Sequence, residues 1–367
     1  MMQSAPTIAG LMAPILADAP ITHRLDVTFG DVTVVVSSNS KGLIEKLANY
    51  YRDFIGGGGA TLIPVTAIEA GPPDLELPFA VKQREPGKTK LKESYCDLPD
   101  GRVVKKLLTG LLFLFGHGDN YAVGPCIDND NQVVNFINNR FIEHCLKRGA
   151  LLFHAAGVAE GGAGLVISGF SGAGKSTLAL EIMRHGTDFV SNDRVMVSRE
   201  GAGLVMTGVA KMPRVNPGTV LNNPNLAPVM DAEDRERFSA LPQAELWDLE
   251  HKYDAFIDDC FGKGRFKLSC PMAGLVVLRW KRDTSPMTAS RVRLRDRRDL
   301  MAAFMKDVGL FYEFEDAAEP SIASQNAYLD LLGDLPVLEI DGGVDFHKAA
   351  QACLEFLRQA RTETQPS

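Results

Sequence analysis

Apolar residues recur along this chain with two periods, and each period predicts a different kind of element. Alternation with a period of two, as at Leu25, Val27 and Phe29, predicts a half-buried strand. Apolar residues three and four positions apart predict an amphipathic helix. The strands predicted in this way are 21–38 with a turn at Gly30, 61–68, 91–96, 102–115, 151–156, 165–167, 188–197, 204–209, 273–280 and 336–340. The predicted helices are 41–54, 132–146, the run that follows residue 176, 231–249 with a break at Pro242, 296–308 and 345–361.

The order of these elements divides the chain into two parts. Strands dominate up to about residue 125, and no residue pattern there indicates chemistry. Strands and helices then alternate from 132–146 onward, which is typical of an α/β domain. We therefore predict an N-terminal α/β domain over 1–128 and a larger α/β domain over 129–367. Within the second domain, 211–225 is predicted to be irregular because prolines recur in it.

Composition narrows the class of protein. The chain has 367 residues, of which 45% are hydrophobic and 23% are charged, as in an ordinary globular protein. A formal net charge of -7 gives no reason to expect nucleic acid or an anionic membrane as a partner. The six cysteines are scattered without a C-x-x-C pair, which predicts neither a cysteine zinc site nor a disulfide framework, and reduced thiols fit a cytoplasmic protein. The N-terminus lacks the basic segment of a signal peptide, and the most apolar run, 107–115, is too short to span a bilayer.

The clearest chemical signal is the pattern G-x-x-x-x-G-K-S at residues 169–176. It lies between an apolar strand and a helix, which is the arrangement of a phosphate-binding P-loop. Glycines let the backbone turn so that its N–H groups converge, and the helix N-terminus adds partial positive charge. We expect Lys175 to reach the outer phosphates of ATP and the Ser176 hydroxyl to ligate Mg²⁺. The residues expected to bind the nucleotide are Gly169, Phe170, Ser171, Gly172, Ala173, Gly174, Lys175, Ser176 and Thr177.

A second signal interrupts the strand at 188–197, where Asn192, Asp193 and Arg194 occur in succession. A right-handed crossover places this strand parallel to the one that feeds the glycine-rich loop. Asn192 and Asp193 then fall at the carboxyl end of the sheet, where ligands of α/β proteins bind. A carboxylate there can hold Mg²⁺ or take a proton from an attacking hydroxyl. A turn, or an ion pair between Asp193 and Arg194, is the alternative without a catalytic role.

Three further residues are weaker candidates. His154 lies near the end of strand 151–156 and is followed by small residues, so it is either a satisfied core histidine or a group beside the ligand. Kinases need a cation that stabilises the charge of the transferred phosphoryl group. Arg214 and Arg265 are the candidates for that cation, although a surface ion pair is the commoner role of such residues.

Three segments, in this order and spacing, resemble the catalytic domain of the bacterial HPr kinase/phosphorylase family, which phosphorylates a serine of the phosphocarrier protein HPr. They are 153–158 (FHAAGV), 169–177 (GFSGAGKST) and 191–195 (SNDRV). The segment 211–219 (KMPRVNPGT) resembles a related group, HPr-kinase-related kinase B. The resemblance implies a catalytic domain of the HPr kinase and phosphoenolpyruvate carboxykinase type, with ATP and Mg²⁺ as cofactors.

The resemblance also implies roles for individual residues. Lys175 and its loop would bind the ATP phosphates, and Ser176 and Asp193 would serve the metal. Asp193 would be the base that deprotonates the acceptor hydroxyl, with His154 close to the transferring phosphate. The departures concern the same region, because Asn192 stands where the family usually has aspartate, and the downstream glutamate signature that supplies a second metal ligand is missing. Neither the reverse phosphorylase activity nor HPr as substrate is therefore carried over.

The predicted function is that of an ATP-dependent kinase that phosphorylates a hydroxyl, with a serine of a protein as the first candidate acceptor. A small-molecule alcohol is the second candidate; a deep apolar pocket roofed by 211–225 would favour it, whereas a broad open cleft would favour a protein. An ATP-sensing module without turnover is the third, because a carboxylate is missing at Asn192. The hexameric assembly of the family suggests a homo-oligomer, and neither nucleic acid nor membrane is an expected partner.

Overall fold

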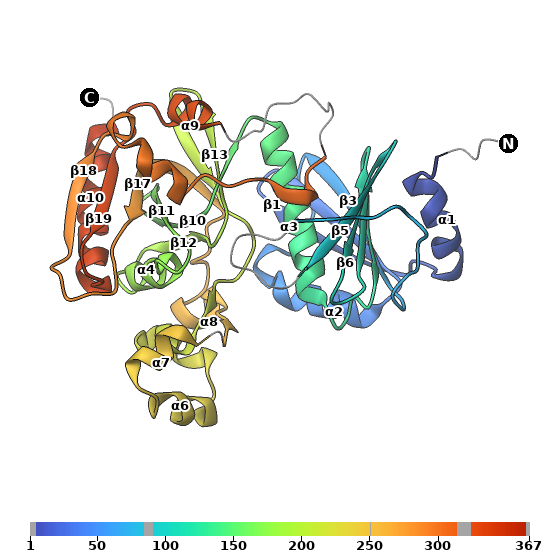
Figure 1. Cartoon of the computed structure of the whole chain (residues 1–367), viewed down its shortest axis with the longest axis horizontal. Helices are drawn as coiled ribbons and strands as arrows, with labels where there is room; N and C mark the ends of the chain where they lie inside the picture. The colour runs from blue at the N-terminus through green and yellow to red at the C-terminus, as the bar shows by residue number, and fades with distance from the viewer. Residues whose placement is uncertain (1–4, 84–90, 250, 314–323, 365–367) are drawn as a thin grey trace. The chain divides into compact units, whose positions relative to one another are not determined.

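The computed structural model describes residues 5–83, 91–249, 251–313 and 324–364 (Figure 1). Helices and strands are mixed along the chain, which confirms the predicted α/β class. The chain forms two compact units, one of residues 1–144 with 308–319 and the other of residues 145–307 with 320–367. In the part of the chain that the structure describes, no helix combines the length and the apolarity needed to cross a membrane.

The first unit contains an eight-stranded sheet. Its strands are β1 (His23–Phe29), β2 (Val32–Ser38), β3 (Thr61–Glu69), β4 (Ala80–Val81), β5 (Glu93–Leu98), β6 (Gly101–Lys106), β7 (Leu112–Gly116) and β8 (Asp119–Gly124). They follow the order β1-β2-β3-β8-β7-β6-β5-β4, with β2, β3 and β8 as parallel neighbours and the other pairs antiparallel. The helices are α1 (Ile8–Asp18), α2 (Lys41–Tyr50) and α3 (Asp130–Lys147), with short 3-10 helices η1 (Arg52–Phe54) and η5 (Gly309–Phe311).

Strand β7 shows how this sheet is covered. Successive side chains of a strand point to opposite faces. Leu112 and Leu114 accordingly join the apolar cluster that includes α1. Phe113 and Phe115 point the other way and contact Phe136 of α3, with ring centroids 4.8 and 6.1 Å apart. Helices α1 and α3 therefore lie on opposite faces of the sheet (Figure 1).

The compact units divide after His144, whereas the sequence placed the boundary near residue 128. The reason is long-range aromatic packing. Phe136 of α3 and Phe311, which comes from the returning segment 308–319, both contact Phe113, at 4.8 and 5.5 Å. Helix α3 and this returning segment therefore belong to the first core, and the helical periodicity of 132–146 could not show which sheet the helix would cover.

The second unit contains a nine-stranded sheet and a separate two-stranded one. The strands of the large sheet are β9 (Leu151–Phe153), β10 (Ala155–Glu160), β11 (Ala163–Gly169), β12 (Asp188–Ser191), β13 (Val195–Glu200), β14 (Gly203–Thr207), β17 (Ser269–Leu278), β18 (Thr288–Val292) and β19 (Val337–Asp341). The small sheet pairs β15 (Arg214–Val215) with β16 (Tyr253–Asp254).

The large sheet branches at its longest strand, β17. The carboxyl-terminal half of β17 lies parallel to β11 on one side and to β19 on the other. Its first residues instead pair antiparallel with β14, which continues through β13 to β9. On the other side of β11, β10 and β12 follow, each antiparallel to its neighbour. Strands β11 and β12 are therefore parallel, as the crossover rule predicted, with β10 between them.

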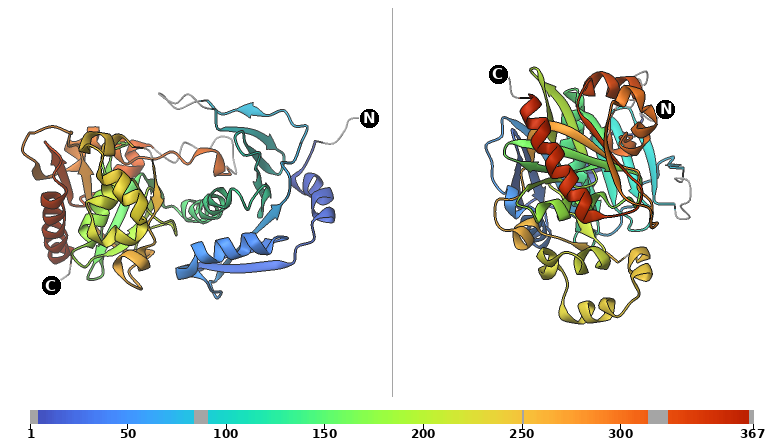
Figure 2. Two further views of the ribbon diagram at one scale, coloured as in Figure 1. Left: turned by 90° about the horizontal axis from the view of Figure 1, so that it is seen from below. Right: turned by 90° about the vertical axis from the view of Figure 1, so that its left-hand side faces the viewer.

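Helices cover both faces of this sheet. The helices of this unit are α4 (Lys175–Met183), α5 (Pro217–Leu221), α6 (Ala232–Ser239), α7 (Gln243–Asp248), α8 (Ile257–Phe261), α9 (Gln325–Leu332) and α10 (Phe346–Thr364), with 3-10 helices η2 (Pro224–Val229), η3 (Leu294–Asp296) and η4 (Arg298–Ala303). Of these, α6 and α7 lie away from the large sheet (Figure 1). Along β11, Leu165 and Ile167 join the core under α4 and α10, whereas Val166 joins the core under η4 and α9. Figure 2 shows α10 running across one face of the sheet.

Three predicted elements differ from the observed ones. The run 102–115 is a hairpin of β6 and β7 instead of one strand, because Gly110 adopts a positive φ of 74° in the connecting turn. The predicted helix 296–308 consists only of short 3-10 helices up to Ala303. The segment 211–225, predicted to be irregular, contains α5, which Asn216 caps and which begins with proline at its first position.

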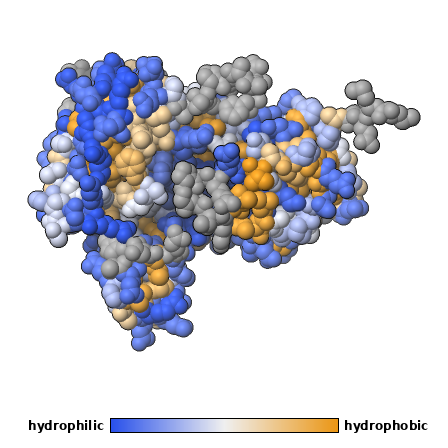
Figure 3. Space-filling view, in the orientation of Figure 1, coloured by the Kyte–Doolittle hydropathy of each residue, from blue (hydrophilic) through white to orange (hydrophobic). Residues whose placement is uncertain are grey.

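The outer strand of the branched sheet, β18, has a polar surface. Its first four residues are all exposed, and the fourth, Arg291, donates a hydrogen bond to Gln359 of α10 at 3.2 Å. Figure 3 shows a hydrophilic strip on the visible face of the second unit. Polar and charged side chains on an edge strand discourage pairing with other chains.

Candidate functional site

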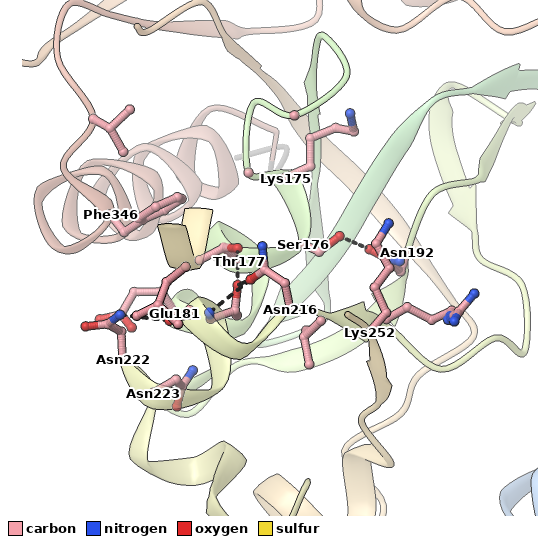
Figure 4. A pocket seen from close by; sticks show the side chains of 18 of the residues that line it. Lys175, Ser176, Thr177, Glu181, Asn192, Asn216, Asn222, Asn223, Lys252 and Phe346 are labelled. Carbon is pink, nitrogen blue, oxygen red and sulfur yellow. Dashed lines mark hydrogen bonds between the residues drawn. The ribbon is translucent and has the colours of Figure 1, made fainter. Parts of the chain in front are cut away.

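Residues 169–176, the glycine loop, connect β11 to α4 (Figure 4). Gly172 and Gly174 adopt positive φ angles of 80° and 82°, a region that side chains with a Cβ disfavour. Gly174 is also the N-cap of α4, and a Cβ there would lie 2.7 Å from the Phe346 ring. The loop conformation thus depends on glycine at both positions, and at Gly174 for a second, steric reason.

Two aromatic residues hold this loop from outside. Trp280 Nε1 donates a hydrogen bond to the Ala173 carbonyl at 2.8 Å. The Trp280 ring meets the Phe346 ring edge-on, with centroids 5.0 Å apart. Because Phe346 begins α10, the loop is supported by an element far along the chain, a support that the loop motif itself does not reveal.

Lys175 is buried and folds back over the loop. Its Nζ donates hydrogen bonds to the carbonyls of Gly169 at 2.8 Å and Phe170 at 3.3 Å. Burial lowers the pKa of Lys175 to about 8, opposed by the charge of Asp193 and assisted by that of Lys306. The ammonium group is thus held by neutral carbonyls in a place where an anion would bind it more strongly.

The sheet register brings the other predicted residues to the same edge. Ala155 of β10 lies opposite Ser168 of β11, and Gly157 of β10 lies opposite Ser191 of β12. His154, which precedes β10, therefore lies beside the start of the glycine loop and beside the residues that follow β12. His154 Nε2 is 3.4 Å from Asp193 Oδ1. The register thus brings together two strand ends and a loop that are separated in the sequence.

Asp193 has two unusual properties. Its φ is +69°, which is rare for a residue with a side chain and is typical of functional sites that the surrounding structure holds in place. Burial disfavours its charged form, but a hydrogen bond with His154 and three nearby cations outweigh burial and hold the pKa of the carboxyl far below its usual range. The cations are Lys306, Arg194 and Lys211.

Ser176 and Asn192 meet at the centre of the site. The Ser176 hydroxyl donates a hydrogen bond to Asn192 Oδ1, drawn as a dashed line in Figure 4. Ser176 Oγ keeps its lone pairs, and the ionised Asp193 carboxylate follows Asn192 directly. Hydroxyl, amide and carboxylate oxygens are the donors that a hard cation such as Mg²⁺ prefers, so this donor set fits the expected metal.

The segment after Lys211 forms another wall of the site. Thr177 on α4 shares a hydrogen bond of 2.9 Å with Thr219 of α5, and Thr219 donates another to the Asn216 side chain at 2.9 Å. These bonds connect the helix that follows the glycine loop to the Pro/Asn-rich segment (Figure 4). The resemblance of 211–219 singled out this segment, but not the contact it makes with Thr177.

The predicted arginines have different positions. Arg194 Nε lies 3.7 Å from Asp193 Oδ2, and Arg214 lines the pocket with its Nε 3.5 Å from Asp254. Arg265 is not brought to the site. It pairs with Asp188 at 2.8 Å, at the opposite end of β12 from Asp193, and it is not among the residues that line the pocket. The structure therefore leaves Arg194 and Arg214 near the proposed chemistry and gives Arg265 a role in holding the start of β12.

These residues surround a pocket of about 1350 Å³. From the glycine loop and α4, the pocket is lined by Ser171, Gly172, Gly174, Lys175, Ser176 and Thr177. The other predicted loop residues do not line the pocket but hold the loop through their carbonyls. Gly169 and Phe170 accept hydrogen bonds from Lys175, and Ala173 accepts one from Trp280.

Several pocket residues were not predicted. They are Lys211, Asn216, Thr219, Asn222, Asn223, Gln243, Lys252, Arg282 and Phe346, with Glu181, Arg184 and His347 on the α4–α10 side. Asn216 before Pro217 is a recognisable helix start, and that signal could have been used. The others come from separate elements whose approach depends on the tertiary fold.

No protein-family model matches this chain, and no curated protein matches it in sequence. Among solved structures, that of the Hpr(Ser) kinase/phosphatase from Coxiella burnetii is similar over 59% of this chain and 99% of that chain, with 12% sequence identity and a TM-score of 0.29. A match with so low a TM-score and identity defines neither fold nor activity. The function is therefore inferred from the geometry of the pocket.

Proposed function

We propose that this protein is an ATP-dependent phosphotransferase that transfers the γ-phosphoryl group to a hydroxyl. The observation that carries the proposal is the position of the ionised Asp193 carboxylate, which shares one sheet edge and one pocket with Lys175 and Ser176. A phosphate-binding loop alone would support only nucleotide binding. A carboxylate oriented by His154 beside that loop adds a group for the acceptor.

Each residue has a proposed task. Lys175 exchanges its bonds to the Gly169 and Phe170 carbonyls for bonds to the outer phosphates of ATP. Ser176 and Asp193 would hold Mg²⁺, with Asn192 positioning the serine hydroxyl. Bound Mg²⁺ would neutralise negative charge on the phosphates during transfer.

The low pKa of Asp193 restricts its role. A carboxylate that stays ionised far below neutral pH is a weak base, so it does not remove the acceptor proton before bond formation. We infer that Asp193 accepts a hydrogen bond from the acceptor hydroxyl and takes its proton as the oxygen–phosphorus bond forms. His154 keeps the carboxylate in that orientation. Phosphoryl transfer tolerates such a late proton transfer because its transition state is loose.

Turnover of γ-labelled ATP in a lysate of the source organism tests the proposal. Asp193→Asn should lower acceptor labelling by about 100- to 10,000-fold. It should weaken Mg²⁺–ATP binding much less than it lowers labelling, because Asp193 acts on the acceptor as well as on the metal. Asp188→Asn is the matched control, since it removes a carboxylate at the opposite end of β12 and should leave labelling unchanged.

Two results would contradict the kinase assignment. Equal labelling by native protein and Asp193→Asn would remove Asp193 from the chemistry. ATP binding by the native protein without any labelled acceptor would favour the ATP-sensing module, for which the single carboxylate beside Asn192 is the supporting feature.

The acceptor is proposed to be a protein serine, with a small-molecule alcohol as the second candidate. The size of the pocket favours the small-molecule alcohol. Its volume of about 1350 Å³ exceeds the roughly 300–1,000 Å³ of an ordinary ligand site, which leaves room for a small acceptor beside a nucleotide. Its walls combine polar groups with apolar side chains such as Leu246 and Phe346, so it is not the deep apolar pocket expected for a small acceptor. Separating the labelled lysate by molecular mass decides between the two.

A further inference from the structure

Three side chains with metal-binding atoms meet where α4 approaches α10. Glu181 lies on α4, His185 follows the end of that helix, and His347 lies in the first turn of α10. One ligand atom from each residue lies within 4.8 Å of the other two. His347 Nδ1 lies 3.9 Å from Glu181 Oε1, and the two imidazole rings are 6.3 Å apart between centroids.

The helical fold explains this grouping. His185 lies in the turn that directly follows α4, four residues after Glu181, and its N–H donates to the Ile182 carbonyl at 3.0 Å. Helix α10 packs beside α4 in the same core, and its first turn brings His347 to that face. Glu181 is buried, whereas both histidines are exposed and can be reached by an ion from solvent.

We propose that Glu181, His185 and His347 bind a divalent transition-metal ion of the zinc class. Two imidazole nitrogens and one carboxylate oxygen are the donors of open tetrahedral zinc sites, in which water takes the fourth position. With metal–ligand bonds of about 2.0–2.2 Å, the ligand atoms of such a site lie roughly 3.3–3.5 Å apart. The observed separations need to shrink by about 1.5 Å at most, which rotation of two exposed imidazoles can supply.

The surroundings of His347 fit this role. Its Nε2 lies 3.0 Å from the Gln351 side-chain amide, one turn further along α10. The outer nitrogen of a metal-binding histidine is normally held by such a partner, which fixes the ring while the other nitrogen ligates. A rotated Gln351 amide accepts the proton of Nε2, and Nδ1, the atom that faces Glu181, then binds the ion.

Arg184 competes with the ion. One of its guanidinium nitrogens donates to both Glu181 oxygens, at 2.9 and 3.0 Å, and neutralises this buried carboxylate when no metal is bound. The Arg184 side chain is 36% exposed, so it can move into solvent when the ion takes its place. Metal binding therefore exchanges one partner of Glu181 for another and does not create an unpaired charge.

The site is independent of the proposed kinase chemistry but lies next to it. Glu181 and His347 also line the large pocket. Helix α4 carries Lys175 at its start, and Phe346, the neighbour of His347, packs against Gly174. An ion that joins α4 to α10 would connect the two elements that support the glycine loop. We therefore expect metal binding to raise the unfolding temperature of the chain.

Titration of the chelator-treated full-length protein with Zn²⁺ against a chromophoric chelator tests the proposal. We expect one tight site, and we expect Co²⁺ in its place to give the visible absorption of a tetrahedral ion. His185→Ala and His347→Ala should each weaken Zn²⁺ binding by at least about tenfold. His23→Ala, which removes a histidine of the first unit, should bind like the native protein.

Two further measurements keep the result decisive. Unfolding without metal should be the same for both histidine variants and the native protein, because both side chains are exposed. Arg184→Gln removes the competing guanidinium and should tighten Zn²⁺ binding. The proposal is overturned if the native protein takes up no Zn²⁺ at micromolar concentration, or if both histidine variants bind it as the native protein does.

Discussion

At the scale of single residues, the pocket holds Asp193 and Lys175 in ionisation states that their neighbours determine. Asp193 is kept charged by a histidine and by surrounding cations, although it is half-buried. Lys175 is pushed toward its neutral form by burial. Both pKa values are lowered, which favours the charged form of Asp193 and the neutral form of Lys175. An anion bound at the loop would stabilise the charge of Lys175 and offset the effect of burial.

The pKa of Lys175 gives a prediction for nucleotide binding. Because burial lowers this pKa to about 8, the free protein loses the ammonium charge as the pH rises through that value. Bound phosphates favour the charged form and raise the pKa, so binding takes up a proton above about pH 8. ATP affinity should therefore fall by up to about tenfold per pH unit above that value.

Calorimetry in buffers of different ionisation enthalpy measures this proton uptake directly. Uptake should approach one proton per ATP about one unit above the pKa and vanish about one unit below it. Lys175→Met, the control, should bind weakly and without this proton. Binding by the native protein that takes up no proton at high pH would contradict the lowered pKa.

At the scale of elements, the glycine loop depends on α10 as well as on its own residues. Gly172 and Gly174 have nearly the same φ, but only at Gly174 would an added Cβ meet another side chain, the Phe346 ring. Each change to alanine costs about 1–2 kcal/mol of backbone strain. Gly174→Ala adds a steric conflict, so it should lower the unfolding temperature and the ATP affinity more than Gly172→Ala does.

Phe346→Leu provides the control for this comparison. If contact with Phe346 causes the extra effect, the smaller side chain should relieve Gly174→Ala and leave Gly172→Ala unchanged in a double-mutant cycle. Thermal unfolding of the single and double variants measures the effect on stability, and ATP titration measures the effect on ATP affinity. Equal effects of the two alanine variants would mean that Phe346 does not constrain the loop.

At the scale of the whole molecule, the chain forms two units with separate apolar cores and passes between them three times, after residues 144, 307 and 319. All residues that line the large pocket belong to the second unit. A ligand stabilises the part of a protein that it binds in the folded state. Scanning calorimetry should therefore show two unfolding transitions, and ATP with Mg²⁺ should raise the temperature of only one of them.

Leu114→Ala identifies the other transition. Leu114 is fully buried in the first core, so its truncation should destabilise that unit by about 2–5 kcal/mol. The transition that ATP raises should keep its temperature in this variant. A single transition that both ATP and Leu114→Ala shift would show that the two units unfold together.

Much of the local structure could be predicted from the sequence. The strand, glycine loop and helix around residues 163–183 follow from apolar periodicity and glycine spacing, and the structure confirms them. The break of a strand at Asn192 and Asp193 is also confirmed. Such features depend on residues a few positions apart, so the local sequence is enough to predict them.

The meeting of His154, Asp193 and Ser176 was decided by the tertiary structure. It depends on the register of β10 with β11 and β12, and a one-residue slip would turn the side chains of β10 to the other face. Packing between distant segments also brings Phe346 of α10 to the glycine loop and places α3 in the first core. The sequence by itself determined the glycine loop and the candidate residues of the site. Long-range packing decided which of them share a pocket, because contacts between distant segments form only when apolar side chains are buried in the hydrophobic cores.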